Sequence, residues 1–211
     1  GIPLITTNRF NTIDACETAL QSGCADMVSM ARPFLADPEI VNKSKTNPHA
    51  VNTCIGCNQA CLDHIFQNKI ATCLVNPRAS HETKWPLQAK ATEVRNVAVV
   101  GSGPAGLSAA TEAARLGHQV TLFESAAEIG GQFNMAKRIP GKDEFHETLR
   151  YFDFMLTRYD VNLQLNTEVE VNSLLKFDHV ILATGVKPRA WDIPGSENAR
   201  VVSYLDVLKG R

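Results

Sequence analysis

The feature that most constrains the fold is a run of elements between residues 97 and 124. The apolar residues Val97 to Val100 predict a buried strand, and Gly101-Ser102-Gly103-Pro104-Ala105-Gly106 then turns into a helix rich in small residues. A second strand over residues 119–123 ends at Glu124. Glycines at this spacing allow a tight turn, close approach of a diphosphate and close packing of helix on strand. The run therefore predicts a Rossmann-like domain that binds a dinucleotide.

The acidic residue and two later glycine turns narrow the choice of dinucleotide. A carboxylate at Glu124 accepts hydrogen bonds from ribose hydroxyls and repels a 2′-phosphate, which favours FAD or NAD over NADP. The turns Gly130-Gly131-Gln132 and Thr184-Gly185 can also bring backbone amides close to a ligand. Together they favour FAD, although each turn could equally be an ordinary loop.

Four cysteines form a second pattern. Cys54, Cys57 and Cys61 lie close together, and Cys73 follows after eleven residues. Three local thiolates and a fourth returning from a later segment match the four corners of a 4Fe-4S cluster. Two alternatives stay open at this point: a structural zinc ion, with His64 in place of one thiolate, or four unligated thiols.

The N-terminal residues predict alternating strands and helices. We expect a strand over residues 2–7, a helix on the apolar face of Ile13, Cys16 and Leu20 that ends at Gly23, and a strand over 27–30. Asp37-Pro38 predicts the start of a further helix that runs to about Lys45. This is the repeating unit of a parallel α/β barrel, which needs eight strands, so a barrel requires six more upstream.

Barrels of this kind commonly bind phosphate in the loops after strands seven and eight. Arg9, Ala31 and Arg32 fall in the corresponding loops here. The alternative is that both arginines are surface charges or partners in ion pairs. Residues 46–95 contain few periodic apolar stretches and predict a loop-rich connection that a bound cluster could order.

The C-terminal part predicts the remaining elements of the second domain. We expect an amphipathic helix whose buried face includes Phe145 and Leu156, a half-buried strand over 161–165 and a buried strand over 179–183. The predicted domains are residues 1–47, the end of a barrel; residues 48–95, the iron–sulfur segment and linker; and residues 96–211, an FAD-binding domain.

Composition excludes several classes of partner. The chain has 21 basic and 22 acidic residues and a net charge of -1, which gives no electrostatic reason to bind nucleic acid or an anionic membrane. No apolar run reaches membrane-spanning length, and the N-terminus lacks a signal peptide. We expect a cytoplasmic protein with reduced thiols, and a segment of a longer chain. Its oligomeric state is left open.

With these residues in view, the whole chain resembles an old-yellow-enzyme-like family that includes bacterial NADPH-dependent 2,4-dienoyl-CoA reductases and trimethylamine dehydrogenase. The resemblance is carried by residues 25–38, by the cysteine run through Asp63, and by residues 130–142 and 203–208. The gap of three residues between Cys57 and Cys61 favours the reductase branch.

The resemblance implies an α/β chain made of the C-terminal end of a TIM barrel, namely its seventh and eighth strand–helix pairs, a loop-rich 4Fe-4S segment and a Rossmann-like FAD domain with a parallel sheet. The implied FMN contacts are Arg9, Ala31 and Arg32. The implied FAD contacts, including the glycines of the fingerprint, are Gly101, Gly103, Ala105, Gly106, Glu124, Gly131, Gln132, Lys142 and Val169. No catalytic residue is expected in this segment, and the acid groups and the NADPH domain are expected outside it.

The resemblance also implies an electron relay in the β-oxidation of unsaturated fatty acids. A hydride carries two electrons and an iron–sulfur cluster carries one, so a flavin is needed on each side. Electrons would pass from NADPH to FAD, to the 4Fe-4S cluster, to FMN and then to 2,4-dienoyl-CoA. The alternatives are an amine dehydrogenase of the same family and a zinc-stabilised module without catalytic activity. The segment alone is expected to be inactive.

Overall fold

The computed structural model describes residues 1–87, 90–189 and 192–210. The chain divides into two compact units, which are described separately below. Unit 1 contains Gly1–Ala89 and His146–Met155, and unit 2 contains Lys90–Phe145 and Leu156–Arg211.

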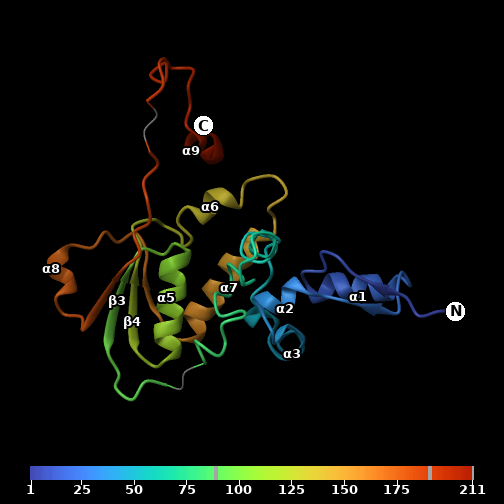
Figure 1. Ribbon diagram of the computed structural model, residues 1–211. Coiled ribbons are helices and arrows are strands. Elements are labelled where there is room, and N and C mark those ends of the chain that lie inside the picture. Colours follow the sequence, from blue (N-terminus) through green and yellow to red (C-terminus); the bar gives the residue numbers. More distant parts are fainter. Residues whose placement is uncertain (88–89, 190–191, 211) are drawn as a thin grey trace. The chain divides into compact units, whose positions relative to one another are not determined.

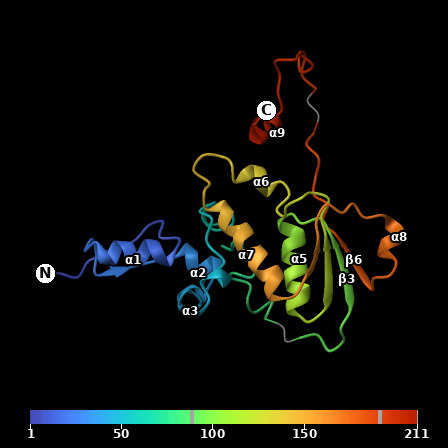
Figure 2. The same cartoon turned by 180° about the vertical axis from the view of Figure 1, so that it is seen from behind.

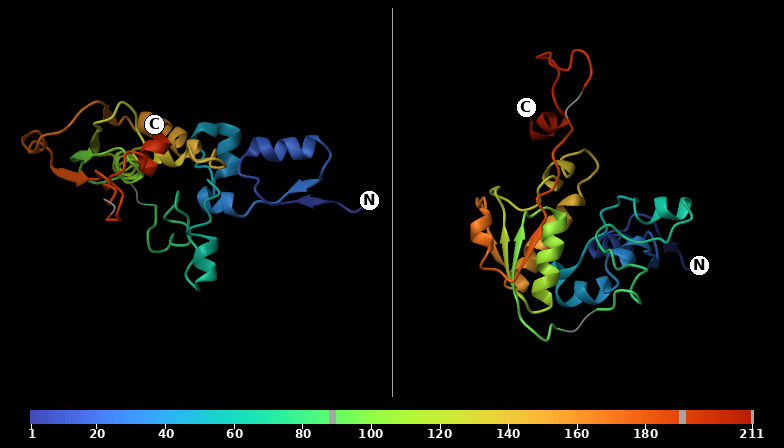
Figure 3. Two further views of the ribbon diagram at one scale, coloured as in Figure 1. Left: turned by 90° about the horizontal axis from the view of Figure 1, so that it is seen from above. Right: turned by 60° about the vertical axis from the view of Figure 1, so that its left-hand side comes forward.

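Unit 1 begins with two short parallel strands and a helix. β1 (Ile5–Thr6) pairs with β2 (Met27–Val28), and α1 (Ile13–Gln21) connects them and lies alongside the pair (Figure 3). The Thr12 side chain caps α1 by accepting a hydrogen bond from the Ala15 amide at 3.3 Å. Gly23 follows the helix with φ +72°, a conformation that suits glycine. The predicted order of strand, helix and strand is found, with shorter strands.

The rest of unit 1 departs from prediction where the second helix begins. The predicted helix after Asp37-Pro38 is found as α3 (Ile40–Thr46), which begins two residues later than expected and ends next to the predicted Lys45, and a short helix that was not predicted, α2 (Arg32–Ala36), precedes it. The buried Asp37 carboxylate accepts a hydrogen bond from the Glu39 amide and pairs with Lys43 at 2.7 Å, and it thus stabilises α3 from outside the helix. The short elements η1 (Pro48–Ala50) and α4 (Leu62–Phe66) follow.

Unit 2 is built on a parallel sheet, as predicted. Within the described residues its strand order is β5-β4-β3-β6, and every neighbouring pair is parallel (Figure 1). The strands are β3 (Asn96–Val100), β4 (Gln119–Phe123), β5 (Asn162–Gln164) and β6 (His179–Leu182). α5 (Pro104–Arg115) connects β3 to β4 and packs against both (Figure 2). This arrangement confirms the α/β, Rossmann-like fold class.

Four further helices complete the described elements, namely α6 (Phe133–Ala136), α7 (Phe145–Arg158), α8 (Val171–Leu174) and α9 (Tyr204–Lys209). Phe145 and Leu156 on α7 are buried, as the apolar spacing predicted. The prediction that residues 179–183 form a buried strand was wrong about burial, since Leu182 is 72% exposed. The reason is position, because β6 is an edge strand of the described sheet. Among the described helices, none is long and apolar enough to span a bilayer.

Candidate cofactor sites

Unit 2 contains a cavity of about 860 Å³ at the carboxyl ends of its strands. Its walls come from the turn after β3, the end of β4 and the turn after β6, which the topology brings together because parallel strands end at one edge. The lining residues singled out from the sequence are Gly101, Gly103, Ala105, Glu124, Gly131, Gln132, Val169, Thr184 and Gly185.

Glycine is needed in the fingerprint for two different structural reasons. A Cβ on Gly101 would lie 2.4 Å from the Ala183 carbonyl oxygen, and one on Gly106 would lie 1.8 Å from the Gly101 carbonyl oxygen. These two positions require glycine because neighbouring backbone occupies the space. A Cβ on Gly103 would meet nothing within 4 Å, although Gly103 lines the cavity. Its bare backbone therefore faces space that a diphosphate can occupy.

Glu124 is held rigidly at the cavity wall. Its Oε2 accepts hydrogen bonds from the Ser102 amide at 2.8 Å and from the Ser102 hydroxyl at 2.7 Å, and its Oε1 accepts one from the Ala126 amide at 2.8 Å. Burial by itself raises the pKa of Glu124, but these donors outweigh it and place the pKa below its usual value. The carboxylate is thus ionised and oriented, which suits the binding of ribose hydroxyls.

Two predicted FAD residues lie elsewhere. Gly106 is buried beneath the turn after β3 and is not part of the cavity wall. The Lys142 ammonium lies 5.0 Å from the centre of the Phe145 ring, and Lys142 does not line the cavity either. Its contact with FAD stays a prediction.

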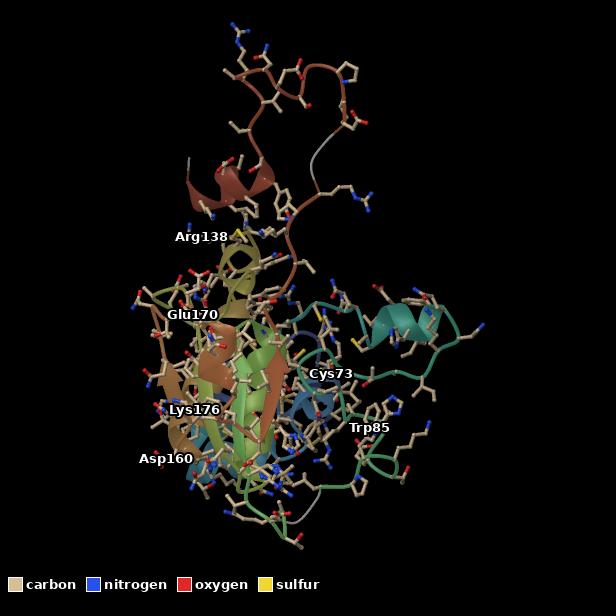
Figure 4. All side chains as sticks on the ribbon, turned by 90° about the vertical axis from the view of Figure 1, so that its left-hand side faces the viewer. Cys73, Trp85, Arg138, Asp160, Glu170 and Lys176 are labelled. Atoms are coloured by element: carbon tan, nitrogen blue, oxygen red, sulfur yellow. The ribbon has the colours of Figure 1, made fainter. Side chains whose placement is uncertain are left out.

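The cavity also has lining residues that sequence reasoning missed. Asn134 donates from Nδ2 to the Ile129 carbonyl at 2.8 Å, which leaves its buried Oδ1 without a partner. Such an atom suits a hydrogen-bond donor of a ligand. Arg138 donates to the Leu208 carbonyl at 2.9 Å, next to α9 (Figure 4). The glycine-rich string before Asn134 was a signal for that residue, whereas no motif marked Arg138.

In unit 1, the four cysteines line one small pocket. Cys54, Cys57, Cys61 and Cys73 are joined there mainly by apolar neighbours. Cys73 lies in the loop segment after α4, and Figure 4 labels it. All four thiols are free. The pocket has a volume of about 10 Å³.

Side-chain hydrogen bonds to backbone hold the two ends of this segment together. Asn52 Nδ2 donates to the Val75 carbonyl at 2.6 Å. This bond joins the chain two residues before Cys54 to the chain two residues after Cys73. The Thr72 amide also donates to the Ala60 carbonyl at 2.7 Å. The distant fourth cysteine therefore reaches the other three through contacts that do not involve sulfur.

Two side chains of α7 in the same unit hold the residues that precede Cys54. Arg150 donates to the carbonyls of His49 and Val51, each at 2.7 Å, and to Glu147 at 2.8 Å. Glu147 in turn accepts a hydrogen bond from the Thr53 hydroxyl at 3.2 Å. Residues 49–53 are thus fixed before the first cysteine.

Two of the four thiols, those of Cys54 and Cys73, sit in an environment that opposes their ionisation. Burial raises the pKa of both, and the nearby cysteines raise both further. Acting against this, backbone amides donate to the two sulfurs, and the positive charge of Arg32 lowers the pKa of Cys54. A positive partner would favour the thiolate form of these two residues.

The donor set is compatible in number with a cluster. A 4Fe-4S cluster takes one thiolate on each of its four irons, and four thiols line this one pocket. Within the residues that the structure describes, no group of three or more His, Cys, Asp or Glu side chains is arranged to hold a metal ion.

The arginines predicted to bind FMN lie against the cysteine segment. A Cβ on Gly56 would approach Arg9 Nη2 to 3.3 Å, and Arg32 lines the cysteine pocket. Ala31 is exposed and precedes α2. Their contact with FMN stays a prediction.

Comparison with known proteins places this geometry in a family. Residues 95–210, which span β3 to α9 and every wall of the dinucleotide cavity, match the family described as pyridine nucleotide-disulphide oxidoreductase. The chain belongs to this family. Residues 1–50 match the NADH:flavin oxidoreductase / NADH oxidase family. These matches support a flavin cofactor and confirm the resemblance to flavin oxidoreductases, whereas the dienoyl-CoA substrate is not tested by them.

The names of individual relatives of this chain indicate different substrates. The metal reductase of Desulforamulus reducens is 39% identical and covers 100% of this chain, which spans 32% of the relative. A solved complex of 2-naphthoyl-CoA reductase is 34% identical, with a TM-score of 0.91 over 99% of this chain and 32% of that protein. The 6-hydroxypseudooxynicotine amine oxidase of Pseudomonas geniculata N1 is 30% identical, with a TM-score of 0.88 over 99% of this chain and 34% of that protein. The chain thus spans about a third of these relatives.

Proposed function

We propose that this chain is the electron-transfer segment of a flavin and iron–sulfur reductase that reduces a conjugated double bond of a CoA thioester, as an NADPH-dependent 2,4-dienoyl-CoA reductase does. The observation that carries the proposal is the common pocket lined by Cys54, Cys57, Cys61 and Cys73. A centre for single electrons has a use in the same chain as a domain that binds a flavin, because a flavin exchanges electrons singly or in pairs.

Each group of residues has a distinct part in this proposal. The four thiolates hold the cluster, and the backbone amides that donate to Cys54 and Cys73 offset its negative charge. Gly103 leaves room for the FAD diphosphate, and Glu124 accepts hydrogen bonds from the ribose. When bound, FAD would accept a hydride from NADPH and the cluster would pass single electrons towards FMN.

The similarity to 2-naphthoyl-CoA reductase supports a substrate in which a CoA thioester is conjugated with carbon–carbon double bonds. The same similarity makes a small-molecule substrate the expected partner. One specific observation favours a second candidate, the oxidation of an amine, since an amine oxidase superimposes over the same 99% of the chain.

Cofactor content tests the electron-transfer part of the proposal. The chain is purified without oxygen, and iron, zinc and flavin are quantified beside an ultraviolet–visible spectrum. We expect about four irons and about one FAD per chain, with a broad absorption that dithionite bleaches. One zinc and no flavin would overturn the proposal and leave a structural module.

Substrate class is tested on the complete polypeptide that carries this segment. Oxidation of NADPH is followed with 2,4-dienoyl-CoA, and reduction of the enzyme is followed with a tertiary methylamine. NADPH oxidation that depends on the thioester supports the reductase, whereas reduction by the amine alone supports the second candidate.

A further inference from the structure

The side chain of Arg32 lies at the pocket of the four cysteines. It lines that pocket, and its Nη1 donates a hydrogen bond to the side-chain oxygen of Asn58. Asn58 directly follows Cys57 and has a left-handed backbone, with φ +62°. The guanidinium is therefore held by the turn between the second and third cysteines.

Arg32 is electrostatically distinctive in this setting. Apart from the thiols, the other residues that line the pocket are aliphatic or carry an amide, so Arg32 is the one basic side chain among the described lining residues. A guanidinium stays protonated at any ordinary pH. Arg32 is half-buried, so water screens its charge less than it screens the charge of a fully exposed side chain.

A charge at this position discriminates between the two redox states of a cluster. One-electron reduction makes the cluster and its four thiolates more negative by one charge, while all iron–sulfur bonds remain. A nearby positive charge stabilises the reduced state more than the oxidised state.

We propose that the Arg32 side chain raises the reduction potential of a 4Fe-4S cluster bound by Cys54, Cys57, Cys61 and Cys73, and so makes the cluster a better electron acceptor. This rests on the proposed function, because it needs the cluster. It differs from contact with a flavin phosphate, since the group acted on is the cluster. Arg32 is a positioning residue in this role and keeps its proton throughout.

The test is a potentiometric titration of the anaerobically purified chain, with dithionite as the electron donor and electron paramagnetic resonance of the reduced cluster as the readout. In Arg32→Gln we expect unchanged iron content. At the wild-type midpoint potential, the ratio of reduced to oxidised cluster should be about tenfold lower, which corresponds to a midpoint potential lower by ~59 mV for one electron. Arg32→Lys keeps the charge and should stay near the wild-type midpoint. Lys45→Gln removes an exposed charge outside the pocket and should change nothing.

A second variant changes the charge without altering Arg32. In Asn58→Asp, the new carboxylate would pair with the guanidinium and cancel its charge, and aspartate tolerates the left-handed backbone at this position. We expect a shift in the same direction as in Arg32→Gln.

The outcomes separate this inference from the proposed function. A wild-type chain without iron would refute the proposed function and, with it, the inference. Wild-type midpoints in both Arg32→Gln and Asn58→Asp, at full iron content, overturn the role of Arg32 while the proposed function stands. Loss of iron from both variants, but not from Lys45→Gln, also overturns it, because Arg32 would then serve only to anchor the loop.

Discussion

The two candidate cofactor sites are built in opposite ways. The dinucleotide cavity of unit 2 is about 860 Å³ and is formed by turns at the ends of regular strands, with bare backbone at Gly103 facing the space. The cysteine pocket of unit 1 is about 10 Å³ and is formed by irregular chain, held by bonds such as that between Asn52 and the Val75 carbonyl. The first site is a wide cavity at one edge of a sheet, and the second is a set of four thiols that loops bring to one small pocket.

This difference indicates which amino-acid substitutions each site should tolerate. The cavity depends on the absence of side-chain atoms at a few positions, so adding one methyl group should block it without unfolding the chain. The pocket depends on the presence of particular sulfur and amide groups, so their removal should abolish or weaken it. Four predictions follow this contrast in order of decreasing effect.

The largest effect is expected for Cys73→Ser. This change removes the thiolate that returns from the later segment, so we expect most bound iron to be lost while FAD content is unchanged. Iron and flavin per chain are measured after anaerobic purification. Cys24→Ser, at an exposed cysteine outside the pocket, is the matched control. Wild-type iron in Cys73→Ser would show that Cys73 is no ligand.

A smaller but selective effect is expected for Gly103→Ala. Gly103 has φ -66°, which alanine adopts without strain, and the new methyl group would enter the cavity. FAD should bind about tenfold more weakly or worse, while the free energy of unfolding changes by less than about 1 kcal/mol, because the weaker N-cap and the lower chain entropy of alanine act in opposite directions. Flavin fluorescence and urea unfolding measure the two quantities. A loss of folding stability as large as the loss of FAD-binding free energy would contradict the idea that the methyl group acts only by filling the cavity. Ser108→Ala on the same helix is the control.

A moderate effect is expected for Asn52→Ala. The variant leaves the Val75 carbonyl without this donor, which should lower the free energy of unfolding of the iron-free chain by about 1–2 kcal/mol. It should also slow the uptake of iron and sulfide, because Cys73 is no longer held near Cys54. Urea unfolding and the time course of uptake are compared with Asn162→Ala, an exposed position in unit 2. Unchanged uptake would mean that the bond does not position the pocket.

The smallest effect is expected for Glu124→Gln, and it concerns pH. The pKa of Glu124 is lowered in the folded chain, so its ionised form stabilises the fold above the ordinary pKa of glutamate, about 4.3. That stabilisation is lost as the pH falls through the lowered pKa. Wild type should therefore lose stability on acidification below about pH 5 more steeply than Glu124→Gln does. Parallel curves in urea unfolding at a series of pH values would contradict this.

The contrast between the two sites also explains what could be predicted from the sequence. The strands at 97–100 and 119–123 and the glycine turn between them were recognisable because short-range spacing determines them. The common pocket of Cys54 and Cys73 was also anticipated, since metal-ligand spacing is a local pattern. The placement of Arg32 beside that pocket could not be predicted, because it depends on where a distant turn at Asn58 lies.

Two details of the fold could not be predicted from local patterns. The helix expected after Asp37-Pro38 begins at Ile40, and the Asp37 carboxylate not only accepts a hydrogen bond from the Glu39 amide, as an N-cap side chain does, but also pairs with Lys43. The apolar residues of the strand over 179–183 predict that it is buried. It is exposed because it lies at the edge of the described sheet, with a neighbouring strand on one side only. Composition alone did not reveal either tertiary effect.

The bond between Asn52 and the Val75 carbonyl has a consequence for the life of the protein under oxygen. It joins the two ends of the cysteine segment through amide and carbonyl groups, which oxidants leave intact. If the chain binds the proposed cluster and then loses it to an oxidant, the frame around the four thiols should persist. Repair would then require only reduction of those thiols and a fresh supply of iron and sulfide, without the synthesis of a new polypeptide.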